Sequence, residues 1–145
     1  MASAQPDPGF WEDRKVTVTG GAGFLGKAVV RQLEELGALV RVIRSSEHDL
    51  RDAEQTRDAV DGAQVVLHLA ARVGGIGFNR RNPAPLAYDN LMMGTNVFEQ
   101  SRLAGVRKLV AACCALKLSI VRRSPSSSGI SASKPSSALA RETSR

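Results

Sequence analysis

Cysteine and aromatic residues are scarce in this chain of 145 residues, and no long apolar run is present. The two cysteines, Cys113 and Cys114, are neighbours, and adjacent cysteines rarely form a disulfide without strain. A disulfide framework is therefore excluded, and a reducing cytoplasm is the expected location. The longest apolar run, residues 109–121, is interrupted by Lys117 and is shorter than the roughly 20 residues that cross a bilayer. We expect no membrane segment, and the first eight residues lack the pattern of a secretory signal.

Acidic residues are almost missing from the last part of the chain. The first 110 residues contain 14 basic and 13 acidic residues, whereas residues 111–145 contain six basic residues and a single acid, Glu142. That last part also contains 10 serines and no aromatic residue. A Ser-rich basic segment without periodicity is typical of disorder, so we expect a disordered tail over residues 113–145. Nucleic-acid binding is not expected, because it would require a basic face on a folded domain or interleaved aromatics.

The first 110 residues alternate between short apolar runs and segments with helical spacing. The apolar runs predict strands at residues 15–19, 38–44, 64–70 and 106–112. The helical spacing predicts helices at 24–36, 50–60 and 85–103, with Asp49 as the N-cap of the second and with Gly37 and Gly105 following the first and third. This order predicts an α/β fold in which helices cover both faces of a parallel sheet.

A glycine-rich loop, residues 19–26 (TGGAGFLG), directly follows the first predicted strand and directly precedes a predicted helix. It satisfies the pattern G-x-G-x-x-G, in which glycines let the backbone turn sharply and approach a pyrophosphate. The helix that begins near Phe24 would offer free N–H groups and the positive end of its dipole to the phosphates. The loop is not a Walker A motif, because Ala28 follows Lys27 where Ser or Thr is needed. Dinucleotide binding is therefore predicted, with a purely structural turn as the alternative.

The end of the second predicted strand bears on the choice of cofactor. An acid there would bind the ribose 2′-hydroxyl of NAD, whereas an arginine accommodates the 2′-phosphate of NADP. The chain has Arg44 at this position, two serines after it, and no acid before Glu47. We therefore expect NADP, with NAD as the alternative. Asp49 and Leu50 are candidates for flanking the adenine.

From about residue 16 to residue 110 the sequence resembles the extended short-chain dehydrogenase/reductases, the NAD(P)-dependent epimerase/dehydratase family. The glycine loop and residues 68–71 (HLAA) are features of the whole family. A smaller set of residues resembles the GDP-L-fucose synthases in particular: residues 73–76 (VGGI), Asn79, Pro83, residues 88–90 (YDN), Thr95 and Asn96. The resemblance implies a Rossmann-like, doubly wound parallel sheet, present here for about four strands. We divide the chain into an N-terminal extension (1–13), a partial NAD(P)-binding domain (14–112) and the tail.

The family resemblance also implies roles for individual residues. It implies that Gly20, Gly23 and Gly26 hold the pyrophosphate, that Leu69, Ala70 and Ala71 line the cofactor cleft, and that Asn90 lies on the helix beside it. The predicted cofactor-binding set adds the residues reached above from the helix start and the strand end: Phe24, Leu25, Arg44, Asp49 and Leu50. The implied contacts to a nucleotide-sugar substrate are Val73, Gly74, Gly75, Ile76 and Asn79, with an ordinary flexible connection as the alternative reading of this loop. Family dimers usually pair through the helix predicted at 85–103, so a homodimer is possible. No metal site is expected, and His68 is interpreted as a core histidine.

The sequence departs from the family at its catalytic residues. Family members carry Ser or Thr after the fourth strand and then a Tyr-x-x-x-Lys pair, in which the tyrosine transfers a proton and the lysine one turn away lowers its pKa. The only tyrosine here is Tyr88, and Met92 stands where the lysine would be. We therefore expect a cofactor-binding half without turnover, of marginal stability and with an exposed sheet edge. A non-catalytic dinucleotide-binding or interaction module and an NAD-dependent epimerase/dehydratase are the alternatives.

The change in composition near residue 111 has two possible origins. A frameshift in the coding sequence would replace family sequence by low-complexity basic sequence, whereas a genuine tail would be part of the native protein. Translating the other two reading frames distinguishes them, because only a frameshift restores a Tyr-x-x-x-Lys helix.

Overall fold

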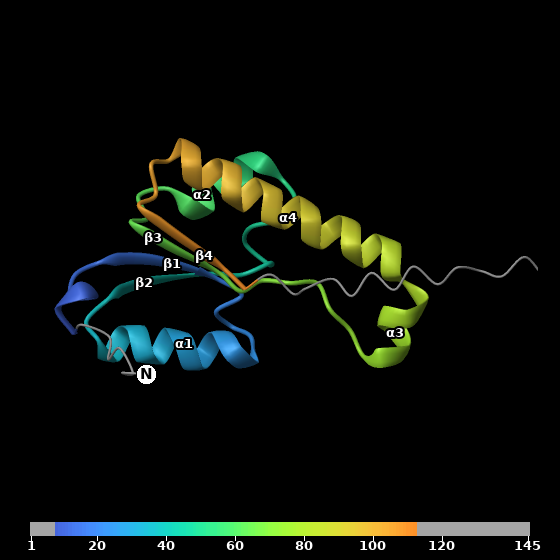
Figure 1. The fold of residues 1–145 in the computed structure, drawn as a ribbon, viewed down its shortest axis with the longest axis horizontal. Coiled ribbons are helices and arrows are strands. Elements are labelled where there is room, and N and C mark those ends of the chain that lie inside the picture. Colours follow the sequence, from blue (N-terminus) through green and yellow to red (C-terminus); the bar gives the residue numbers. More distant parts are fainter. Residues whose placement is uncertain (1–7, 113–145) are drawn as a thin grey trace, which may run out of the picture.

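The computed structural model describes residues 8–112, which form one parallel sheet with helices on both faces (Figure 1). The strands are β1 (Lys15–Thr19), β2 (Leu39–Ile43), β3 (Val65–His68) and β4 (Lys108–Ala111). The helices are α1 (Phe24–Glu35), α2 (Ala53–Val60), α3 (Ile76–Arg81) and α4 (Pro83–Leu103), and a short 3-10 helix, η1, spans Pro8–Phe10. The strand order β2-β1-β3-β4 with parallel pairing confirms the predicted α/β, Rossmann-like fold of four strands. The predicted tail, residues 113–145, lies outside the described residues.

Two apolar clusters hold the sheet between its helices. The first lies on the α1 face and contains Val16, Val18, Leu33, Ala38 and Val65. The second lies on the face covered by α2 and α4 and contains Ile43, Leu50, Ala59, Val60, Val66 and Val97. The neighbours Val65 and Val66 on β3 belong to different clusters, because successive side chains of a strand point to opposite faces. Figure 1 shows α1 on one side of the sheet and α2 with α4 on the other.

Helix α2 begins three residues later than the sequence predicts, and the predicted N-cap Asp49 is wrong. The carboxylate of Asp49 accepts the backbone N–H of Arg51 at 3.0 Å, which forms a local turn ahead of the helix. Asp52 is the N-cap instead, and its side chain accepts the N–H groups of Glu54 and Gln55. The local turn around Asp49 therefore takes the place of the first predicted helical turn.

The connection after β3 contains a helix that the sequence did not predict. Helix α3 is only six residues long and exposes all of its side chains, so it has no apolar periodicity to detect. Asn82 separates it from α4, which begins at Pro83, two residues earlier than predicted. Proline is tolerated there because the first N–H groups of a helix have no partner within it. Gly37 and Gly105 follow α1 and α4 with φ of +82° and +70°, as the predicted helix ends require.

The described sheet has an open edge at β4. Within residues 8–112 this strand pairs only with β3, and Val110 is 44% exposed. Near the start of the described residues, Trp11 packs against the apolar cluster on the α1 face, although the sequence predicted that it belongs to an N-terminal extension.

Candidate functional site

A cleft of about 990 Å³ lies at the carboxyl ends of β1, β2 and β3. In the strand order β2-β1-β3-β4, the connection after β1 leads to β2 on one side, whereas the connection after β3 leads to β4 on the other. The two connections therefore leave the sheet in opposite directions. Parallel α/β sheets bind ligands at such a reversal of strand order. The lining residues are Gly20, Ala22, Gly23, Phe24, Leu25, Gly26, Ile43, Arg44, Ser45, Ser46, His48, Asp49, Leu50, Arg51, Leu69, Ala70, Ala71, Arg72, Val73, Asp89 and Met93.

The glycine loop forms the floor of this cleft and is packed tightly against the rest of the chain. Gly20 has φ of +72°, and a Cβ there would lie 2.7 Å from the backbone N of Ala70. A Cβ on Gly26 would lie 2.2 Å from the carbonyl oxygen of Gly20. The N–H of Gly23 donates to that same oxygen at 3.0 Å and closes the turn. The glycines thus let the loop, the end of β3 and the start of α1 meet at backbone distance.

The first turn of α1 presents donors to the cleft. Phe24 and Leu25 are exposed, and their backbone N–H groups belong to the set that has no acceptor within a helix. These N–H groups and the positive end of the helix dipole suit an anion. The donor set therefore fits the pyrophosphate of a dinucleotide.

The wall after β2 carries a cation and two hydroxyl groups. Arg44, Ser45 and Ser46 are all exposed and line the cleft, whereas Glu47 does not line it. The carbonyl oxygen of Arg44 accepts the N–H groups of Glu47 and His48, at 3.1 and 3.0 Å, which fixes the turn. Among the described arginines of the cleft, Arg44 has no carboxylate partner. It is therefore the arginine of this cleft that is free to bind a phosphate.

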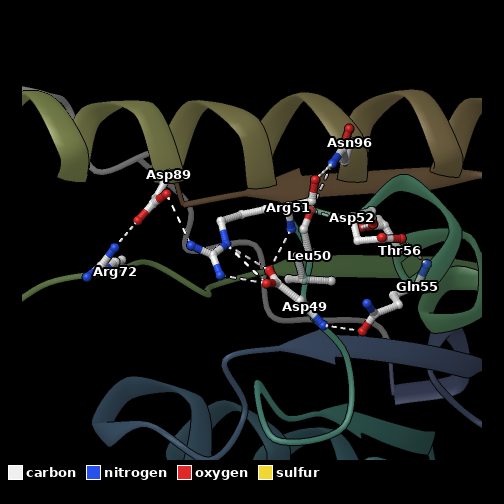
Figure 2. Close-up of polar contacts among 9 residues, drawn as sticks. All are labelled: Asp49, Leu50, Arg51, Asp52, Gln55, Thr56, Arg72, Asp89 and Asn96. Atoms are coloured by element: carbon white, nitrogen blue, oxygen red, sulfur yellow. Dashed lines mark hydrogen bonds and ion pairs between the residues drawn. The ribbon is translucent and has the colours of Figure 1, made fainter.

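The other two arginines of the cleft are bound to carboxylates (Figure 2). Arg51 donates to Asp49 at 2.6 Å and to Asp89 at 3.3 Å, and Arg72 donates to the other oxygen of Asp89. The hydrogen bonds from Arg51 lower the pKa of Asp49 to about 2. The pKa of Asp89 is lowered chiefly by its hydrogen bond from Arg72. Both carboxylates are therefore charged at neutral pH and neutralise these two arginines.

The structure brings most of the predicted site residues together. All of the residues implied for cofactor binding line the cleft except Asn90, and of those implied for the substrate only Val73 does. Asn90 instead binds the backbone of Arg72, accepting its N–H at 2.7 Å and donating to its carbonyl oxygen at 3.0 Å. Asn79 accepts the N–H of Gly74 at 2.9 Å. Asn79 and Asn90 thus shape the loop after β3 and do not line the cleft.

The sequence indicated no role at the site for several lining residues. Arg51, Asp89 and Met93 come to the cleft from a turn and from α4. One indication for Asp89 was present in the sequence: an acidic residue on the inward face of a predicted helix requires a hydrogen-bonding or charged partner. Its partners are 17 and 38 residues away in the chain, so the sequence pattern alone did not reveal them.

His68 lies beside the cleft as part of the core, as predicted. It is 6% exposed, and its Nδ1 lies 2.7 Å from Oγ1 of Thr19. That oxygen accepts the N–H of Ala70 at 3.3 Å, so the hydroxyl proton is available to the neutral ring. Burial lowers the pKa of His68, because desolvation disfavours the charged imidazolium.

We expect the free energy of unfolding to be lower at pH 5 than at pH 7.5 because of His68. The unfolded state binds more protons between the lowered pKa and the ordinary value of about 6.5, so stability rises with pH across that interval. Urea denaturation of the wild type and of His68→Asn across this range measures the effect. The variant should lose most of the slope. An unchanged slope in His68→Asn would show that the buried ring is not the source.

Two kinds of feature are missing from residues 8–112. No group of three or more potential metal-ligating side chains occurs in this part of the chain. No helix described in it is long and apolar enough to cross a membrane.

Known proteins resemble this chain in sequence and in fold. GDP-mannose 3,5-epimerase of Arabidopsis thaliana is 29% identical over 123 aligned residues, which cover 73% of this chain and 33% of that protein. GDP-L-fucose synthase of Escherichia coli K12 is 34% identical over 100 residues, covering 67% and 31%. The solved structure of a GDP-L-fucose synthetase from Naegleria fowleri bound to NADP is 30% identical with a TM-score of 0.57, covering 69% and 30%.

The chain spans about a third of the length of the curated relatives. The model of the NAD-dependent epimerase/dehydratase family matches residues 16–128, which extends past residue 110, where the sequence analysis placed the end of the resemblance. This match covers most of the chain and includes the glycine loop and, apart from Lys15 at the start of β1, all four strands. The chain therefore belongs to the NAD-dependent epimerase/dehydratase family.

Proposed function

We propose that residues 14–112 are the cofactor-binding half of an NADP-dependent nucleotide-sugar epimerase/reductase similar to GDP-L-fucose synthase. The support is the cleft at the reversal of strand order, with a glycine loop and the first turn of α1 as its floor. Backbone N–H groups at this helix start bind the pyrophosphate, and Leu69, Ala70 and Ala71 form the adjoining wall. NADPH, when bound, supplies the hydride.

The preference for NADP rests on one observation, the state of the three arginines that line the cleft. Arg51 and Arg72 are engaged by Asp49 and Asp89, which leaves Arg44 without a carboxylate partner in the described chain. Ser45 and Ser46 add two hydroxyl donors beside it, and Glu47 lies outside the lining. This set suits the 2′-phosphate of NADP, because a charge-assisted hydrogen bond is about twice as strong as a neutral one. NAD, which requires an acid here, is the alternative cofactor.

The substrate side of the proposal depends on the loop after β3. Val73 lines the cleft, and the exposed residues Gly74, Gly75, Ile76 and Asn79 come after it in the chain, which supports contact between this loop and a nucleotide sugar. Relatives that match the chain act as a GDP-mannose epimerase and as a GDP-L-fucose synthase by name, which supports a GDP-sugar.

The proposed half-enzyme has no turnover by itself. Its only tyrosine, Tyr88, is 64% exposed on α4 and does not line the cleft, and Met92 follows it where a lysine would be needed. A non-catalytic dinucleotide-binding module is the second candidate, favoured by this same observation.

Helix α4 also suggests how two copies associate. Tyr88, Leu91, Phe98 and Leu103 are exposed apolar residues along this helix. We propose that this surface pairs with a second copy of the chain, because exposed apolar patches commonly mark interfaces.

Titrating the 145-residue chain into NADPH while following nicotinamide fluorescence tests the proposed function. We expect saturable binding of NADPH, with NADH weaker by about tenfold or more because it lacks the 2′-phosphate. Addition of GDP-4-keto-6-deoxymannose should cause no oxidation of bound NADPH. Failure to bind either nucleotide would overturn the cofactor-binding role, and observed turnover would overturn the inactivity. Binding of NADH in preference to NADPH would favour the NAD-dependent alternative.

A further inference from the structure

Helix α4 holds two of the loops that border the cofactor cleft through three polar side chains, Asp89, Asn90 and Asn96. Asn96 donates to the carbonyl oxygens of Leu50 and Arg51, at 3.0 and 2.8 Å, in the loop after β2. Asn90 binds the N–H and carbonyl groups of Arg72 in the loop after β3. Helix α4 thus forms hydrogen bonds to the backbone of two walls of the cleft, the loop after β2 and the loop after β3.

Asp89 differs from these two amides because it binds both walls with one carboxylate. One of its oxygens accepts a hydrogen bond from Arg51 and the other from Arg72 (Figure 2). Its side chain is 8% exposed, whereas those of Arg51 and Arg72 are 47% and 51% exposed. A charged carboxylate is buried at such a position only when donors compensate its lost hydration. The two guanidinium groups, whose residues line the cleft, are therefore held by a buried carboxylate.

We propose that Asp89 is a positioning residue, which fixes Arg51 and Arg72 and so holds the two walls of the cleft at the separation that a bound dinucleotide requires. This positioning role rests on the proposed binding of NADP. It assigns a function to a residue that does not itself contact the phosphates. The two ion pairs restrain both guanidinium groups, so binding has less side-chain freedom to remove.

Removing the charge of Asp89 distinguishes a positioning role from a purely electrostatic one, because the two roles predict opposite changes in NADPH affinity. If Asp89 acted only through its field, Asp89→Asn would remove a negative charge near the phosphates and would tighten NADPH binding. If Asp89 positions the arginines, the same change loosens the hold on at least one of them and weakens binding. An amide also offers an N–H group where the carboxylate accepted a hydrogen bond, so one of the two arginines loses its acceptor.

The experiment compares NADPH binding to the full chain and to Asp89→Asn, at a temperature where circular dichroism shows each to be folded. We expect the dissociation constant to rise about tenfold, the loss typical of hydrogen bonds to a charged group. The anisotropy of bound NADPH should fall, because the released walls leave the cofactor more mobile. Glu99→Gln is the matched control, since Glu99 is on the same helix, also binds an arginine and does not line the cleft. It should leave both readouts unchanged.

A second variant keeps the test valid if Asp89→Asn does not fold. Arg72→Lys preserves the charge of a half-exposed residue but replaces the guanidinium that donates to Asp89 by a shorter, more flexible and more strongly hydrated ammonium group. The positioning proposal therefore predicts weaker NADPH binding, whereas the field explanation predicts unchanged binding. Unchanged or tighter binding by the folded Asp89→Asn variant would overturn the proposal, as would wild-type affinity in Arg72→Lys. A wild-type chain that binds no NADPH would instead overturn the proposed function, so the two failures are distinguishable.

Discussion

Replacing Gly26 by alanine is expected to abolish detectable NADPH binding and to lower the free energy of unfolding by about 2 to 3 kcal/mol. The added Cβ would lie 2.2 Å from the carbonyl oxygen of Gly20 and 2.6 Å from the Cα of Gly21. Both neighbours are backbone atoms, so no side chain can rotate away, and the glycine loop must move off the start of α1. The N–H groups that face the cleft move with it.

Gly94→Ala is the matched control for this variant. Gly94 also lies inside a helix, α4, but a Cβ there meets no atom within 4 Å. Helix propensity alone then applies, and alanine should raise the free energy of unfolding by roughly 0.5 to 1 kcal/mol. Urea denaturation of both variants measures the opposite changes in the free energy of unfolding, and NADPH titration measures the affinity of each. Retained NADPH affinity in a folded Gly26→Ala variant would show that the loop tolerates displacement and that its backbone does not hold the phosphates.

Replacing Arg44 by glutamine is expected to weaken NADPH binding by about 10- to 100-fold and to change NADH binding by less than about twofold. The guanidinium has no carboxylate partner among the described residues, so the proposed 2′-phosphate contact is the interaction that the change removes. NADH has no such phosphate, so its dissociation constant should be nearly unchanged. Parallel fluorescence titrations with the two nucleotides measure the ratio of their dissociation constants.

Arg107→Gln controls for the loss of one positive charge. Arg107 is exposed and precedes β4, at the end of the sheet opposite the cleft. It should leave both affinities unchanged apart from a small, salt-dependent effect. An equal loss of NADPH and NADH affinity in Arg44→Gln would assign Arg44 to a part of the cofactor that both nucleotides share, and the NADP preference would then need another origin.

The local elements of this domain followed from the sequence because each has a signal within a few residues. Alternating strands and helices carry apolar runs or apolar spacing, and the glycine loop lies between the first strand and helix. The errors came where a polar group changed the local outcome. Asp49 accepts the N–H of Arg51 and delays α2, and α3 has no buried side chain to give it a pattern.

The sequence by itself determined the α/β class, the glycine loop and the placement of Arg44 at a strand end, since these depend on neighbours in the chain. Tertiary structure alone decided the strand order, the pairing of Arg51 and Arg72 with Asp89, and the burial of Asp89 between them. Those contacts join residues 17 and 38 positions apart, across loops that follow different strands. No local pattern predicts which distant arginine will pair with Asp89, because the pairing forms only once the sheet and α4 have packed together.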